Sequence, residues 1–226
     1  AESNIFLALL AATIAGVLVS FLFAVLVVVL RTNQVVTGIT LVFLGYGLTG
    51  LIGTSWTDKP MRGIQPFELP LLSEIPFAGE IFFSQDPMIY FTFLLVILVW
   101  HVVYRSKTGL VLRAIGENPQ AADANGHSVI VYRFFAVIAG GALIGLAGGY
   151  LSLAAAKIFV FEMTQGRGWI AVALVIFARW MPIRVVLGGI LFGSIEALIP
   201  RVMAIGLPIP QYYLQMTPYL ATLFVL

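Results

Sequence analysis

The sequence predicts an all-α protein, a polytopic bundle of transmembrane helices. Of its 226 residues, 61% are hydrophobic and only 10% are charged, against about 25% charged residues in an average soluble domain. The mean hydropathy is +1.04, and the 22 glycines and 17 phenylalanines suit helices that pack within lipid. A soluble globular domain is excluded, because too few charged side chains are present to cover its surface.

Seven stretches are predicted as membrane spans, since a bilayer core needs about 20 mostly apolar residues per helix. They are residues 5–30, 35–55, 88–104, 134–153, 169–181, 185–205 and a stretch from 217 onward. The stretch at 169–181 is short and is expected to take in part of 164–168. The last stretch stops after ten residues, so we expect the sequence to be truncated at the C-terminus; a truncation at the N-terminus is also expected. Seven is then a lower bound.

Basic residues in the connecting loops predict the orientation. With Arg31 in the cytoplasm, alternation places six more basic residues on that side: Arg105, Lys107, Arg113, Arg133, Arg179 and Arg184. Residues 105–133 then form a cytoplasmic loop, and the acidic, proline-containing segment 56–87 faces outward. The whole chain, 1–226, is expected to be a single transmembrane domain.

Several function classes are excluded by composition. A net charge of +2 gives no field that would gather nucleic acid. Without cysteine there is no disulfide or thiolate site, and two distant histidines do not predict a metal site. An intramembrane enzyme would need a third group to orient Ser194 and His101, and none is apparent. We therefore expect no catalytic residue, no metal and no cofactor on this chain.

Small residues repeat at intervals of four along two spans, in the series Gly141, Gly145 and Gly149 and in the pair Gly189 and Gly193. This spacing lets helix backbones approach closely in lipid. Two interpretations stay open: static packing, or a seam along which helices slide during transport.

Glu196 and Arg201 are charges within a span, where an unpaired charge is costly. Five residues apart on an ideal helix they point in different directions, so direct pairing would require a kink at Pro200. Glu196 is either one half of a structural ion pair, with this or another partner, or part of a polar pathway.

The most distinctive stretch is GLVLRAIGENPQAADANGHSV, residues 109–129. Asn118 is a good N-cap, Pro119 suits a first helical turn, and Gly126 supplies a left-handed stop. A short capped helix is therefore predicted. Because it is too short to be stable alone, it must pack either on its own protein, as an ordinary connector, or on a partner.

The run LRAIGENPQAADANG within this stretch resembles the cytoplasmic coupling loop in permease subunits of the branched-chain amino acid, simple sugar and nucleoside class of ATP-binding-cassette (ABC) importers. Three further stretches resemble the same family in the same order: TNQVVTGITLVFLGYGLTG, FEMTQGRGWIAVALVIFARWMPIRVVLGGILFG and TPYLATLFVL. The segment GRGWIAVALVIFARW is more similar to the sugar and nucleoside branch.

The resemblance implies a type II importer permease fold in a bacterial or archaeal plasma membrane. It implies four kinds of partner: ATPase subunits that bind ATP and Mg, a second permease subunit, an extracytoplasmic substrate-binding protein and membrane lipid. It also assigns coupling to eight residues: Gly116, Glu117, Asn118, Pro119, Ala121, Ala122, Asp123 and Gly126. In agreement, these 226 residues contain no GxxxxGK[ST] phosphate loop.

Polar or aromatic residues in otherwise apolar spans are candidates for the substrate path. They are Asn33, Gln34, Thr37, Gln165, Arg167 and Trp169, which could hydrogen-bond hydroxyls or stack on a ring. Asn33 and Gln34 could instead cap a helix, and Trp169 could belong to an interfacial belt. The predicted substrate is a nucleoside or a simple sugar. The alternative function is a secondary transporter or channel for a small polar solute, which would favour buried ionisable relays or inverted repeats.

Overall fold

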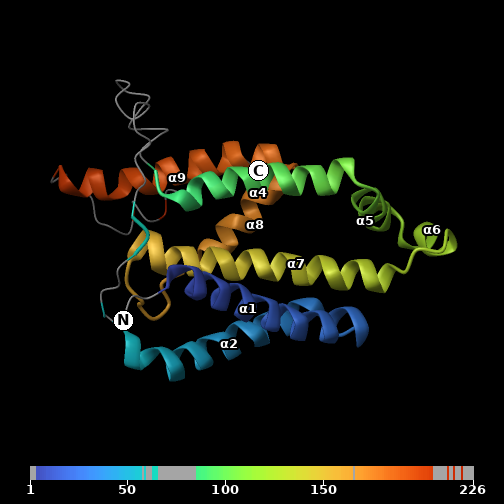
Figure 1. Cartoon of the computed structure of the whole chain (residues 1–226), viewed down its shortest axis with the longest axis horizontal. Coiled ribbons are helices and arrows are strands. Elements are labelled where there is room, and N and C mark those ends of the chain that lie inside the picture. The colour runs from blue at the N-terminus through green and yellow to red at the C-terminus, as the bar shows by residue number, and fades with distance from the viewer. Residues whose placement is uncertain are drawn as a thin grey trace. The chain divides into compact units, whose positions relative to one another are not determined.

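The computed structural model describes residues 4–57, 59, 63–65, 85–164 and 166–205, together with residues 213, 216 and 220. Every regular element in these ranges is a helix (Figure 1), which confirms the all-α prediction. The chain divides into two compact units. Unit 1 comprises Ala1–Thr92 and Lys107–Met163, and unit 2 comprises Phe93–Ser106 and Thr164–Leu226.

Five helical stretches in the described part of the chain are long and apolar enough to cross a membrane. The first is α1 (Ile5–Ala24) with the π-helix η1 (Val25–Val29). The second is α2 (Gln34–Gly53) with the 3₁₀-helix η2 (Thr54–Trp56). The others are α4 (Pro87–Arg105), α7 (Val129–Tyr150) with the π-helix η3 (Leu151–Ala156), and α9 (Pro182–Ala204). Each corresponds to one of the seven predicted spans.

The predicted span at 169–181 is a shorter helix, α8 (Arg167–Phe177), of 11 residues. Its start is set by Gly166, which has a φ of 78°. After Phe177 the backbone turns left-handed at Arg179 and Trp180, with φ of 51° and 63°, and Met181 is extended before Pro182, as a residue preceding proline prefers. The seventh predicted span lies outside the described residues except for residue 220, so the count of seven is not confirmed.

The closest helix packing in unit 1 joins α1 to α7. A Cβ atom added at Gly16 would lie 2.7 Å from the Cα of Gly145, and one at Gly149 would lie 2.8 Å from the Cβ of Ala12. Phe21 and Phe134 extend this contact with an edge-to-face ring pair, 5.7 Å between centroids. At these glycines no side chain larger than a hydrogen atom fits between the two helices. Close packing through small residues is expected for helices in lipid.

The two ends of α7 differ in charge. Near its first turn, Arg31 and Arg133 line one pocket of unit 1. At its other end the Tyr150 hydroxyl donates to the Asp86 Oδ2 at 3.1 Å, and the backbone N–H of Ile64 donates to Leu153 at 3.0 Å. Arg31 and Arg133 thus lie at one end of unit 1, and Asp86 lies at the other.

Candidate functional site

The stretch with the strongest functional signal forms two short helices, α5 (Lys107–Glu117) and α6 (Pro119–Ala124), which we call the helix pair. Asn118 lies between them, and its side chain accepts a hydrogen bond from the Ala121 N–H at 3.0 Å. Gly126 follows with a φ of 83°, and the His127 N–H closes the helix end on Ala122 at 3.1 Å. The predicted N-cap, first-turn proline and left-handed stop are therefore confirmed.

Helix α5 is not among the elements that the sequence predicts. It packs through Ile115, which is only 2% exposed and is the largest fully buried side chain in the described residues. Apolar Val111, Ala114 and Ile115 recur at helical spacing within it, a pattern that could have revealed an amphipathic helix. The capped helix α6 is thus supported by a second helix that anchors it to unit 1.

A groove of about 390 Å³ runs between α5 and α6. It brings together four of the predicted coupling residues, Glu117, Asn118, Ala121 and Ala122, with Leu110, Val111, Ala114, Asn125 and His127 around them. Ala122 is buried at 6% exposure and Glu117 is exposed. The groove has small, mostly apolar walls with one carboxylate at its edge.

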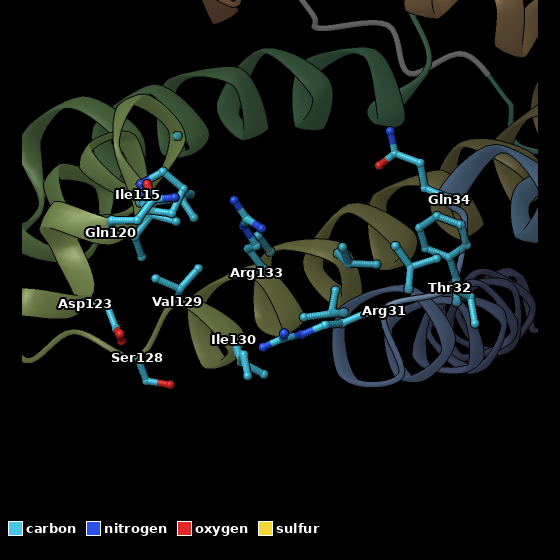
Figure 2. Close-up of a pocket in the computed structure, with 18 residues that line it drawn as sticks. Arg31, Thr32, Gln34, Ile115, Gln120, Asp123, Ser128, Val129, Ile130 and Arg133 are labelled. Carbon is cyan, nitrogen blue, oxygen red and sulfur yellow. The ribbon is translucent and has the colours of Figure 1, made fainter.

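A larger cavity, of about 950 Å³, lies on a different face of the helix pair, and we call it the basic pocket (Figure 2). Its walls come from six helices and one turn: the end of α1, η1 and the turn after it, the start of α2, α5, α6 and the first turns of α7. The lining residues include Phe23, Val27, Arg31, Thr32, Gln34, Gly116, Pro119, Asp123, Ser128, Arg133 and Val137. Of the four remaining predicted coupling residues, Gly116, Pro119 and Asp123 line this pocket. Gly126 follows the end of α6.

Three predicted path residues lie together in unit 1, near the start of α2. The Asn33 Oδ1 accepts from the N–H groups of Val35 at 3.0 Å and Val36 at 3.2 Å, so this side chain caps the helix, which is the alternative interpretation of Asn33 given above. Gln34 lines the basic pocket. Thr37 is 8% exposed, and its Oγ1 lies 3.0 Å from the Oγ1 of Thr32.

The other predicted path residues belong to unit 2, at the start of α8, except Gln165, which lies outside the described residues. Trp169 is 74% exposed. Arg167 contacts Glu196 on α9: its Nε donates to Oε1 at 2.9 Å and its Nη2 to the same oxygen at 2.5 Å. Glu196 is thus paired across two helices with Arg167, not with Arg201 on its own helix.

The predicted packing glycines differ in their surroundings. Gly141, Gly145 and Gly149 face α1, whereas a Cβ at Gly189 or Gly193 would meet no described atom within 4 Å. The glycine of α9 that meets a neighbour is Gly188, where a Cβ would lie 2.6 Å from Leu174 of α8. The packing role of Gly189 and Gly193 stays a prediction.

Comparison with known proteins identifies the family. Residues 1–226 match the family model described as branched-chain amino acid transport system / permease component. The chain is 41% identical to the "Putative glucose ABC transporter permease protein TsgC13" of Haloferax volcanii, over 85% of this chain and 60% of that protein. It is 36% identical to the nucleoside ABC transporter permease protein NupC of Lactococcus lactis, and 33% identical to the guanosine ABC transporter permease protein NupQ of Bacillus subtilis.

The last two matches each cover 97% of this chain and 72% of the relative, so the chain spans less than the full length of all three proteins. No solved structure matches the chain. The resemblance noted in the sequence, to the sugar and nucleoside branch, is confirmed by these relatives. With its five apolar helices of membrane-spanning length among the described residues, this multi-pass membrane protein belongs to the family of branched-chain amino acid transport system permease components.

Proposed function

We propose that this chain is the transmembrane permease subunit of an ATP-driven importer for a nucleoside or a simple sugar, located in a bacterial or archaeal plasma membrane. The observation that carries the proposal is the similarity along nearly the whole chain to permease proteins named for guanosine, nucleosides and glucose. In this proposal residues 1–226 form a single permease domain of the type II importer fold.

Residues 105–133 would act as the cytoplasmic coupling loop. The helix pair suits this role, because α6 is capped at both ends and rests on α5 through a buried face. A rigid element of this kind can transmit movement of a partner to the spans that flank it. Glu117, Asn118 and Ala121 line the groove that would meet the ATPase, and ATP and Mg would bind to that separate subunit.

The substrate would pass along polar side chains of the spans. Thr37 in unit 1 and the Arg167–Glu196 pair in unit 2 offer hydroxyl, guanidinium and carboxylate groups to a hydroxylated ligand. A second permease subunit, identical or different, would complete the path, and an extracytoplasmic binding protein would deliver the substrate to it.

The test of this proposal replaces Gly126 in the full-length subunit, reconstituted in liposomes with its ATPase and permease partners. At a φ of 83° a β-branched residue is strained by roughly 1–2 kcal/mol, whereas asparagine tolerates this conformation. Gly126→Val is expected to separate ATP hydrolysis from uptake of labelled nucleoside or sugar, while Gly126→Asn retains coupled uptake. Equal, normal uptake by both variants would contradict the coupling role.

A second arm tests the class of transporter. The subunit alone is expected to hydrolyse no ATP and to move no solute, because the nucleotide site lies on a partner. Uptake by the lone subunit down a concentration gradient would contradict the proposal and would favour the alternative function, a secondary transporter or channel.

A further inference from the structure

We infer that the basic pocket binds an anionic phospholipid, with its phosphate between Arg31 and Arg133 and its acyl chains along the apolar walls. The two arginines come from separate elements, the turn after η1 and the first turns of α7. Both residues line the pocket; in Figure 2 the Arg133 side chain extends into its middle, and the Arg31 side chain runs along its edge and ends beside Ile130. Two guanidinium groups that line one pocket from separate elements suit a phosphate, which offers several acceptor oxygens.

Within the described part of the chain, Arg31 and Arg133 make no side-chain hydrogen bond and no ion pair, whereas Arg167 pairs with Glu196. Asp123 is the single acidic side chain among the lining residues. Two positive charges and one negative charge leave the pocket with a surplus of one positive charge, which one phosphodiester would neutralise.

The depth of the pocket favours a lipid over a soluble anion. Arg31 comes two residues after the span Ile5–Val29, and Arg133 lies four residues into the span Val129–Ala156, so both belong at the level of the headgroups. Val27 and Val137 line the same pocket, one helical turn or about 6 Å deeper than the arginines. An occupant must therefore present a charge at one end and hydrocarbon at the other.

The pocket also differs from the proposed ATPase contact. Pro119 and Asp123 of α6 face the pocket, whereas Ala121 and Ala122 face the groove on the other side of the same short helix. A lipid in the pocket would thus support the inner face of the helix pair and leave its groove open. This consequence for coupling rests on the proposed function, but lipid binding itself does not.

The experiment measures lipid retention by native mass spectrometry on the full-length transporter complex, titrated with phosphatidylglycerol. Each arginine near an anionic lipid contributes about 1 kcal/mol, or roughly fivefold in affinity. R31Q and R133Q are each expected to weaken binding about fivefold, and the double variant about 25-fold. The charge-retaining double variant R31K/R133K should stay within a few-fold of the native protein. R184Q is the matched control, since Arg184 is another exposed arginine predicted on the cytoplasmic side but does not line the pocket.

Two further ligands separate the sources of the phosphate. Phosphatidylcholine with the same acyl chains is expected to bind much more weakly than phosphatidylglycerol, and sn-glycerol 3-phosphate, which lacks hydrocarbon, is expected not to compete. The inference would be overturned if the double glutamine variant retained phosphatidylglycerol as the native protein does, or if the soluble phosphate bound equally well. An effect of R184Q as large as that of R133Q would also overturn it. Lipid retention is measured without any transport assay. The lipid-binding inference and the proposed importer function can therefore be contradicted independently of each other.

Discussion

Replacement of Gly145 by alanine tests the close approach of α1 and α7. The added Cβ would lie 3.0 Å from the Cα of Gly16 and closer still to the carbonyl oxygen of Ala12. Both neighbours are backbone atoms, which cannot rotate away, so the helices must separate by several tenths of an ångström to about 1 Å to restore ordinary contact at roughly 3.4–4 Å. Overpacking of this kind costs about 1–3 kcal/mol.

The same helix provides the control. A Cβ at Gly148 would meet no described atom within 4 Å, so Gly148→Ala adds helix propensity of up to about 1 kcal/mol without a clash. In detergent-purified full-length protein, Gly145→Ala should lower the Tm by roughly 2–12 °C, and Gly148→Ala should leave it unchanged or slightly raised. Equal Tm values for the two variants would refute the packing geometry.

Three further predictions concern hydrogen bonds and charges. Arg167→Gln removes the described ion-pair partner of Glu196 within a membrane segment, at a cost of about 3 kcal/mol. The double variant Arg167→Gln/Glu196→Gln should therefore unfold at a higher denaturant concentration than Arg167→Gln alone. Tyr150→Phe removes the donor to Asp86, whose other carboxylate oxygen is already buried without a partner in the described structure; we expect about 1–3 kcal/mol lower stability, and a value near zero would count against this contact. Asn118→Ala removes a cap worth about 1 kcal/mol and should therefore raise the rate of amide hydrogen exchange in α6. Asn118→Ser should leave that rate unchanged, because serine is also a good N-cap.

Much of the fold follows from local sequence signals. The five long spans could be predicted because a bilayer requires continuous apolar helices, and their observed ends differ from the expected ones by only a few residues. Helix α6 could be predicted because Asn118 and Gly126 act on their immediate neighbours. Both kinds of inference depend on residues within a turn or two of one another.

Pairings between distant segments could not be predicted. Arg167 and Glu196 are 29 residues apart, and nothing in either local sequence specifies the other as its partner. The stripe Gly141, Gly145 and Gly149 was visible, but its partner on α1 was not identified. Ala12 and Gly16 contact that stripe at the same spacing of four residues, so a search for matching small-residue series on two spans could have paired α1 with α7.

The end of α8 was also missed, because apolar residues continue beyond Phe177 while the backbone leaves the helix. Left-handed conformations at Arg179 and Trp180 are unfavourable for such side chains and are not encoded by a glycine. They are held by the turn, in which the Trp180 N–H donates to Val175 at 3.2 Å. Tertiary context overrides local preference at this point.

The shortness of α8 has a consequence for assembly. Its 11 residues cover about 16 Å, roughly half of a hydrocarbon core of about 30 Å. If the chain crosses the membrane between Lys157 and Arg179, as the charge distribution predicts, non-helical backbone must cover the rest, and lipid cannot satisfy its peptide groups. That segment must then be enclosed by protein or water, so this crossing becomes stable only when neighbouring helices are in place, and folding of this part of the chain is coupled to assembly of the transporter.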